Sequence, residues 1–198
     1  MAKTMLYIHG NGGSPAEAER FRHLCPGWSV AGVGYCGAYP WTAKPAIEAA
    51  FLSALSSGPA AVIANSIGAY YAMCALQGMP VEKALFISPV LDMEELIRRM
   101  MLRAGVSEAE LMERREITTA SGEVLSWEYL RFARETRLRW DAPTAILYAE
   151  NDELISRASV ERFCSGHSAS LTVMPGGEHW FHTDDQLAFL DDWVRGNI

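Results

Sequence analysis

The sequence predicts an α/β protein built on a doubly wound, mainly parallel sheet, and two observations support this prediction. Apolar runs of strand length alternate with segments of helical periodicity along most of the chain. The runs are continuously apolar, as expected of strands that helices cover on both faces. With 198 residues, of which 49% are hydrophobic, the chain can build one full core. We therefore expect a single domain over residues 1–198.

Six apolar runs are expected to form the strands of the sheet. They are Met5–His9, Trp28–Val33, Ala60–Asn65, Lys83–Ser88, Thr144–Ala149 and Ser170–Met174. The helices expected beside them are about Ala16–Leu24, Ala43–Ser56, Ile67–Gln77, Arg157–Cys164 and Asp184–Arg195. The last helix follows a capping-box pattern from Thr183 to Gln186, so we expect it to begin just after His182.

One interval, residues 92–140, breaks the alternation because it contains no convincing core strand. Four apolar residues from Met93 onward follow the i, i+3, i+4, i+7 spacing of an amphipathic helix. A capping pattern begins at Ser107, and a further helix is expected from Ser126 to about Arg139. We interpret residues 92–140 as an insertion that forms a helical cap or lid, because loops at one edge of such sheets border the ligand crevice. The alternative is a purely structural helical appendage.

Composition excludes several classes of function. The 24 acidic residues outnumber the 17 basic ones, giving a net charge of −7, so binding of nucleic acid through its phosphates is not expected. No apolar run approaches the length of a membrane span, and the short one near the N-terminus lacks a signal cleavage site. The four cysteines show neither a CxxC pair nor metal-ligand spacing. We expect a cytoplasmic protein without a metal site.

The strongest local signal is the sequence ANSIG, Ala64–Gly68, between an apolar run and a helical segment. A serine on a sharp strand-to-helix turn is exposed to substrate, and the N–H of the next residue, Ile67, faces the developing oxyanion. Small residues at positions 64 and 68 let the strand and the helix approach closely. The sequence therefore favours Ser66 as a nucleophile, the alternative being an ordinary helix N-cap serine.

A glycine-rich segment, His9–Pro15, follows the first expected strand. Glycines permit backbone conformations in which an N–H turns inward toward an anion. A phosphate-binding loop is excluded, since neither Gly-Lys-Ser/Thr nor the G-x-G-x-x-G spacing is present. An ordinary glycine-rich turn remains the alternative.

Acidic residues follow the fifth expected strand, in the segment Tyr148–Glu153. A carboxylate at the end of a sheet strand is well placed to orient a histidine and to stabilise its imidazolium. We favour Asp152 over Glu150 and Glu153, because it lies three residues past the strand end at Ala149. A solvated acidic turn is the alternative.

Two histidines follow the last expected strand, in the segment Gly176–His182. His179 follows the flexible Gly176-Gly177 pair, with only Glu178 between them. His182 immediately precedes the helix cap at Thr183. We therefore favour His179 as a general base and leave His182 as the alternative, bonded locally or lining a cleft.

The four motifs occur in the order oxyanion loop, serine, acid and histidine, each at the end of an expected strand, where they would converge on one crevice. Together they resemble the α/β-hydrolase superfamily, and small bacterial esterase-like members in particular, over nearly the whole chain. His9–Asn11 resembles the H-G-x oxyanion segment, Ala64–Gly68 the nucleophile turn, Asp152 the acid and His179 the base. One departure is the Ala64 that replaces the usual glycine. The other is that the first expected strand already leads into the oxyanion segment, so we do not expect the N-terminal antiparallel hairpin of larger members.

The resemblance implies a six-stranded sheet in the order 2-1-3-4-5-6, with the insertion as a cap after the fourth strand. It implies an oxyanion hole formed by the backbone N–H groups of Asn11 and Ile67, and chemistry that needs no cofactor or metal. Aromatic residues of an apolar acyl pocket would include Trp127, Trp180 and Phe181, although each could instead serve in core packing.

The function expected from these residues is that of a serine hydrolase that cleaves a small or medium acyl ester or thioester. Its partner would be a small-molecule acyl substrate, and the sequence does not specify the oligomeric state. A peptidase or a C–C bond hydrolase using the same triad is one alternative, because fold and triad do not fix the substrate. A non-catalytic binding or scaffold protein that retains the fold is the other.

Overall fold

The computed structural model describes residues 2–198, which form two compact units. The first unit consists of the residues before Asp92 together with Arg139–Ile198, and it contains the large sheet. The second unit is Asp92–Leu138, the segment inserted after the fourth strand of that sheet. None of the helices in the described part of the chain combines the length and apolarity needed to cross a bilayer.

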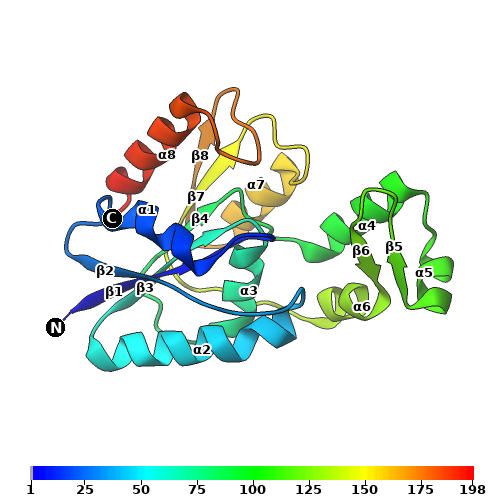
Figure 1. The fold of residues 1–198 in the computed structure, drawn as a ribbon, viewed down its shortest axis with the longest axis horizontal. Coiled ribbons are helices and arrows are strands. Elements are labelled where there is room, and N and C mark those ends of the chain that lie inside the picture. Colours follow the sequence, from blue (N-terminus) through cyan, green and yellow to red (C-terminus); the bar gives the residue numbers. More distant parts are fainter. Residues whose placement is uncertain (1) are drawn as a thin grey trace. The chain divides into compact units, whose positions relative to one another are not determined.

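The sheet of the first unit has six strands, all parallel (Figure 1). They are β1 (Lys3–Ile8), β2 (Trp28–Gly32), β3 (Ala60–Asn65), β4 (Ala84–Ile87), β7 (Thr144–Ala149) and β8 (Ala169–Met174). Their order is β2-β1-β3-β4-β7-β8, which confirms the expected order of the six sheet strands. The carboxyl ends of β1, β3, β7 and β8, which precede the four motifs, therefore lie at one edge.

Burial explains why the strands read as continuous apolar runs. At the centre, all four residues of β4 are buried, as are the first five of the six in β3. The outer strands β2 and β8 expose or half-expose most of their residues. The sequence signal was thus strongest where helices cover both faces.

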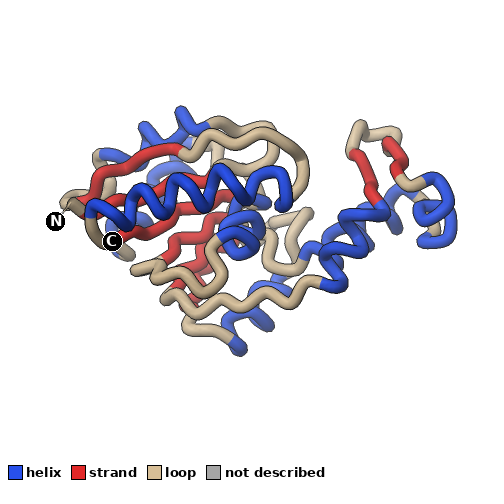
Figure 2. Tube along the Cα trace, turned by 90° about the horizontal axis from the view of Figure 1, so that it is seen from below, coloured by secondary structure: helices blue, strands red, loops and turns tan. Residues whose placement is uncertain are grey.

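Helices cover both faces of this sheet, as Figures 1 and 2 show. A short 3-10 helix (Pro15–Ala18), α1 (Glu19–Arg22) and α8 (Asp184–Gly196) supply residues to the core cluster on one face. On the other face, α2 (Pro40–Ser57) and α3 (Ile67–Ala75) pack against each other and against β1 and β3. The remaining helix, α7 (Arg157–Gly166), packs against β8.

Most helix starts are fixed by local side chains. In five helices a side-chain oxygen accepts a hydrogen bond from the backbone N–H three residues on. These caps are Asp92, Ser107, Ser126, Ser156 and Thr183. Helix α2 begins three residues before the expected Ala43, because Pro40 occupies the first turn, where no N–H is needed.

The second unit contains a small hairpin that the sequence analysis did not anticipate. Its helices are α4 (Met93–Ala104), α5 (Glu108–Arg114) and α6 (Trp127–Glu135), and the antiparallel strands β5 (Glu116–Thr118) and β6 (Val124–Ser126) lie between α5 and α6. Strands of three residues are too short to produce an apolar run, and only Ile117 and its partner Leu125 are buried as a cross-strand pair. Helix α6 ends at Glu135, before the expected Arg139.

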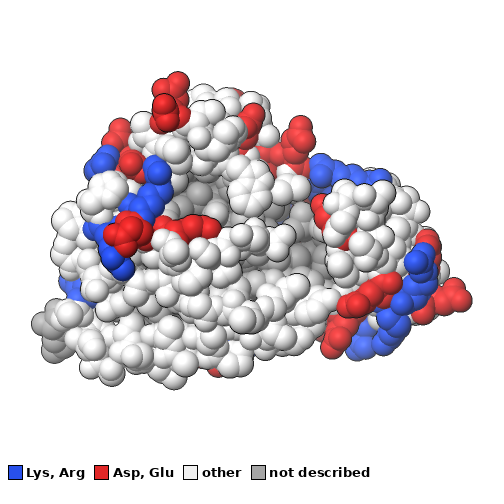
Figure 3. Space-filling view, viewed as in Figure 1, with Lys and Arg blue, Asp and Glu red and all other residues white. Residues whose placement is uncertain are grey.

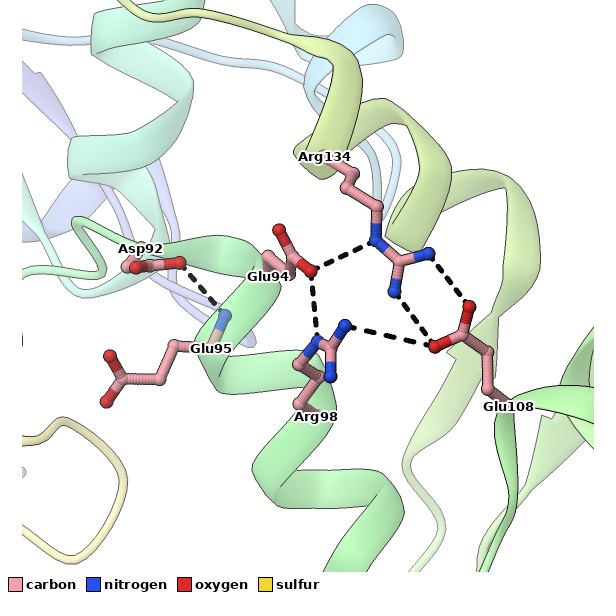
Figure 4. Close-up of polar contacts among 6 residues, drawn as sticks. All are labelled: Asp92, Glu94, Glu95, Arg98, Glu108 and Arg134. Atoms are coloured by element: carbon pink, nitrogen blue, oxygen red, sulfur yellow. Dashed lines mark hydrogen bonds and ion pairs between the residues drawn. The ribbon is translucent and has the colours of Figure 1, made fainter.

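Ion pairs connect the three helices of the second unit (Figure 4). Arg134 of α6 donates two hydrogen bonds to Glu108 of α5, at 2.8 and 3.0 Å, and one to Glu94 of α4 at 3.0 Å. Arg98 donates to the same Glu94 oxygen at 2.9 Å and lies 3.9 Å from Glu108. The Arg134 guanidinium lowers the pKa of the Glu108 carboxyl. All four side chains are partly exposed, so each ion pair alone contributes little to stability. Any larger contribution comes from the network, because it joins all three helices.

The surface of the second unit interleaves acidic and basic side chains, as Figure 3 shows on one face. Such alternation is typical of solvated helices and forms no single-signed field for an anion or for nucleic acid.

Candidate active site

Ser66 lies on the sharp turn between β3 and α3, with a φ of 52° and a ψ of −122°. Non-glycine residues rarely adopt a positive φ, so the surrounding chain must hold this conformation. The Ser66 N–H donates to the Ile87 carbonyl at 2.9 Å, and the Ser66 carbonyl accepts from the Val90 N–H at 3.0 Å. Ser88, between these two partners, also has a positive φ, of 42°. The turn after β4 therefore holds the serine backbone on both sides.

Two glycines let other backbone segments approach this turn. A Cβ on Gly68 would lie 2.4 Å from the His9 carbonyl oxygen, closer than any real contact. A Cβ on Gly10 would lie 3.2 Å from the Cβ of Ser66. The fully buried Ala64 occupies the position where glycine is usual. Close packing between β1 and α3 therefore depends on Gly68 and brings the glycine-rich loop beside the serine.

The Ser66, His179 and Asp152 side chains form one chain of hydrogen bonds. The Ser66 Oγ lies 3.0 Å from His179 Nε2, and His179 Nδ1 lies 2.7 Å from Asp152 Oδ2. The Asp152 side chain is 0% exposed and that of His179 is 6% exposed. The structure thus brings together three residues that are far apart in the sequence.

The backbone around Asp152 fixes the position of its carboxylate. Its Oδ1 accepts the backbone N–H groups of Leu154 and Ile155 at 2.9 and 2.8 Å. Its Oδ2 is then left to accept a hydrogen from His179 Nδ1. The His179 tautomer with hydrogen on Nδ1 leaves the Nε2 lone pair facing Ser66. The arrangement can therefore remove a proton from the serine hydroxyl and stabilise the resulting imidazolium.

The other candidate acids, Glu150 and Glu153, and the other candidate histidine, His182, lie outside the hydrogen-bond chain of Ser66. Glu150 Oε2 accepts the Gly176 N–H at 2.8 Å, and Glu153 is exposed. The His182 side chain is 60% exposed, and its Nδ1 lies 2.8 Å from the Trp180 carbonyl oxygen. Neither Glu150 nor His182 takes part in the hydrogen-bond chain of Ser66.

Glu150 has a role that the sequence analysis missed. Its bond to Gly176 and the bond from the Asn151 N–H to the Gly177 carbonyl, at 2.8 Å, join the loop that bears Asp152 to the loop that bears His179. Gly176 has a φ of 66°, which suits glycine in the turn. The acid and base loops are therefore held together by bonds beyond those of the triad.

The glycine-rich loop after β1 is held mainly through Gly10. The Gly10 carbonyl oxygen accepts the Gly13 N–H at 3.2 Å and lies 2.8 Å from Nδ1 of His9. The expected oxyanion donors are the N–H groups of Asn11 in this loop and of Ile67, the first residue of α3. An N–H in the first turn of a helix has no acceptor within that helix. The oxyanion role of both groups stays a prediction.

The expected substrate-binding residues have different environments. Trp180 is 55% exposed and meets the His179 ring edge-on, with ring centroids 5.5 Å apart. Phe181 packs against the core cluster of the first unit, so packing accounts for much of its side chain. Trp127 belongs to the second unit, where its backbone N–H donates to the Arg115 carbonyl at 2.8 Å. Of the three, only Trp180 is placed beside the triad by a direct contact.

Sequence reasoning also missed Tyr35, whose ring stacks on that of His9 at a centroid distance of 4.2 Å. Tyr35 follows β2 in a segment without a motif, so its partner depends on the pairing of β2 with β1. In the described chain, no group of three or more His, Cys, Asp or Glu side chains is arranged to hold a metal ion.

Comparisons with known proteins find similarity in structure. No family model and no curated protein matches the sequence. The structure is similar to that of Est1E from Butyrivibrio proteoclasticus with bound ferulic acid, at a TM-score of 0.78 and 17% identity, over 98% of this chain and 87% of the other. It is also similar to alpha/beta hydrolase domain-containing protein 10 from mouse, at a TM-score of 0.76 and 14% identity, over 98% and 88%. The fold that the motifs implied is therefore confirmed.

Proposed function

We propose that this chain, which has the α/β-hydrolase fold, is a serine hydrolase that cleaves a small or medium acyl ester or thioester. The observation that carries the proposal is the buried hydrogen-bond chain from Ser66 Oγ through His179 to Asp152. A nucleophile, a base and an orienting acid in this geometry support acyl transfer through a covalent intermediate.

In the first half-reaction His179 Nε2 takes the hydroxyl proton of Ser66 as Oγ bonds to the substrate carbonyl carbon. The Asp152 carboxylate stabilises the imidazolium, and the N–H groups of Asn11 and Ile67 bind the carbonyl oxygen as it becomes an anion. The tetrahedral intermediate collapses when His179 gives its proton to the leaving alcohol or thiol. Ser66 then carries the acyl group as an ester.

In the second half-reaction a water molecule replaces the leaving group. His179 takes a proton from the water as its oxygen bonds to the acyl carbon, and the same N–H groups bind the new oxyanion. Collapse returns the proton to Ser66 Oγ and releases the carboxylic acid. The protein groups supply every proton transfer, so the mechanism uses no cofactor or metal.

The proposed substrate is a small molecule with an apolar acyl part. Trp180 supports this, because this residue is 55% exposed and its indole, which contacts the ring of the base, offers an apolar surface. The similar esterase Est1E has ferulic acid, a small aromatic acid, bound in its structure. An ester of a small carboxylic acid is therefore a suitable first substrate for assay.

We further propose that the inserted segment acts as a lid that selects the length of the acyl chain. The proposal rests on where the segment leaves the sheet: Asp92 begins it two residues after Val90, whose N–H is bonded to the Ser66 carbonyl. Chain entering at that position starts at the edge of the sheet where the chemistry occurs.

Covalent labelling with a fluorophosphonate tests the catalytic proposal. We expect the intact protein to gain the mass of one phosphonyl group, mapped by tandem mass spectrometry to Ser66, and the Ser66→Ala variant to gain none. A panel of p-nitrophenyl esters and thioesters of graded chain length then identifies the acyl preference. A wild-type protein that takes up no label at Ser66 would support the scaffold alternative instead.

A further inference from the structure

The Gly10–Asn11 peptide is oriented from its carbonyl side. The Gly10 oxygen accepts the Gly13 N–H at 3.2 Å, and His9 Nδ1 lies 2.8 Å from the same oxygen, so a hydrogen on Nδ1 donates to it. In a planar trans peptide the N–H points opposite to the C=O. Two hydrogen bonds to the carbonyl of Gly10 therefore also fix the direction of the Asn11 N–H, the proposed oxyanion donor.

His9 is itself held by Tyr35 at two points. The two rings stack at a centroid distance of 4.2 Å and an angle of 3°. The Tyr35 hydroxyl also donates to the backbone carbonyl of His9 at 2.5 Å. That carbonyl lies against Gly68, where a Cβ would be only 2.4 Å away, so it has little freedom to rotate. One side chain thus contacts both the ring and the backbone of the residue that orients the oxyanion peptide.

We propose that Tyr35 is a positioning residue for the oxyanion hole. It acts through His9, which acts through the Gly10 carbonyl on the Asn11 N–H, and it takes no part in proton transfer. The inference rests on the proposed function, because an oriented N–H has a catalytic purpose only if a carbonyl oxygen becomes an anion beside it. His9 thereby acquires a role distinct from that of the triad histidine.

The surroundings of Tyr35 and His9 keep both side chains able to donate their hydrogen bonds. Burial raises the pKa of Tyr35, and the neighbouring Tyr71 and Glu17 raise it further, so the Tyr35 hydroxyl stays protonated at working pH. The His9 ring donates from Nδ1 both as the neutral Nδ1–H tautomer and as the cation. Hydrogen bonds accepted by the Gly10 carbonyl also polarise the peptide and strengthen its N–H as a donor.

A Tyr35→Phe variant tests the hydroxyl alone, because the ring that stacks on His9 remains. Tyr71→Phe is the matched control: Tyr71 of α3 meets the Tyr35 ring edge-on at a centroid distance of 5.8 Å, but its hydroxyl donates to the Ala38 carbonyl at 2.8 Å and not to His9. Tyr35→Leu removes the ring and the hydroxyl together. For each variant, thermal unfolding is recorded beside kcat and KM on a short-chain p-nitrophenyl ester.

Loss of a whole oxyanion-hole donor costs roughly 10²–10³ in kcat, and a misdirected donor costs less. We therefore expect kcat of Tyr35→Phe to fall about tenfold with KM unchanged, and kcat of Tyr35→Leu to fall further. The affinity for a trifluoromethyl ketone, which forms an oxyanion adduct with the serine, should fall by the same factor as kcat. Tyr71→Phe should match the wild type in both readouts.

Three results would overturn the assignment of Tyr35. A higher KM with unchanged kcat would make it a substrate contact, and equal losses in Tyr35→Phe and Tyr71→Phe would make it a general packing residue. Unchanged kcat and unchanged ketone affinity in Tyr35→Phe would remove its hydroxyl from the mechanism. Failure of the proposed function is read separately, from hydrolysis that survives in Ser66→Ala.

Discussion

The Nδ1 atom of His179 lies 2.7 Å from Oδ2 of Asp152, and the carboxylate is wholly buried. Two further N–H groups of the acid loop bind the other carboxylate oxygen. The position of the histidine ring is therefore set by an acid that is itself fixed by its own backbone.

Replacing the acid tests this relationship directly. Asp152→Asn keeps the shape but loses the charge, so the favoured histidine tautomer and the stabilised imidazolium are both lost. We expect kcat to fall by about 10³–10⁴-fold. Glu150→Gln is the matched control, since Glu150 bonds to Gly176 and not to His179; it should retain most of the activity. Comparable losses in the two variants would remove the distinction between these acids.

The two histidines of the same loop are expected to differ sharply. His179→Ala removes the base within reach of Ser66 Oγ, and kcat should fall by about 10⁴-fold or more. His182→Ala removes a ring that is 60% exposed and bonded locally, so kcat should stay within a few-fold of the wild type. Steady-state assays on one ester, with circular dichroism to verify folding, make the comparison. A larger loss in His182→Ala would reverse the assignment of the base.

Gly68 should not tolerate a side chain. Gly68→Ala would place a Cβ 2.4 Å from the His9 carbonyl oxygen and 2.5 Å from that of Ile8, and both are backbone atoms that cannot move aside easily. Overpacking of this kind costs about 1–3 kcal/mol of unfolding free energy, or roughly 3–10 °C in Tm. Gly166→Ala, at the end of α7 with open space around it, should leave Tm nearly unchanged. Calorimetry that shows equal Tm values for both variants would contradict the close approach.

The ion-pair cluster of the second unit should make stability depend on pH. The Arg134 guanidinium lowers the pKa of Glu108 in the folded protein, so its contribution is present above the ordinary glutamate pKa of about 4.3 and is lost as the pH falls through the lowered value. Glu108→Gln should therefore lower Tm at pH 7, and this effect should shrink as the pH falls below about 4.3. Glu113→Gln, on the same helix but outside the cluster, is the control. An effect of Glu108→Gln that persists in acid would exclude this ion pair as its source.

Loosening the second unit tests the proposed lid. Arg134→Gln cuts the links from α6 to both α4 and α5, whereas Arg131→Gln removes only a pair with Glu135 within α6. We expect Arg134→Gln to change the ratio of kcat/KM between long-chain and acetate esters, and Arg131→Gln to leave that ratio unchanged. Equal losses on all chain lengths would mark the insertion as structural.

The sheet could be predicted from the sequence because its strands are buried on both faces. The run Thr144–Ala149 has the predicted limits, and β4 is shorter than predicted by one residue at each end. The hairpin β5–β6 could not be predicted, since its strands have three residues each and neither is buried throughout. Local sequence patterns were therefore enough to predict a strand where the segment is apolar throughout.

The residues of the candidate site also fall into those that a local sequence pattern reveals and those that it does not. Ser66 and His179 lie in local patterns, a strand-to-helix turn and a Gly-Gly loop, that sequence reasoning can find. Tyr35 and Glu150 act through partners brought near by strand pairing or by neighbouring loops. Their own neighbours in the sequence carry no trace of those contacts, so they could be found only in the folded chain.

The two serines with positive φ, Ser66 at 52° and Ser88 at 42°, end adjacent strands of the sheet. A non-glycine residue in such a conformation costs about 1–3 kcal/mol. The Ser88 hydroxyl is also buried without a hydrogen-bond partner among the described residues, which adds desolvation energy. The edge of the sheet that carries the chemistry therefore holds two strained backbone positions and one buried hydroxyl, each of which lowers the stability of the fold. Residues selected for stability alone would not keep this combination, so the need to present Ser66 accounts for its presence.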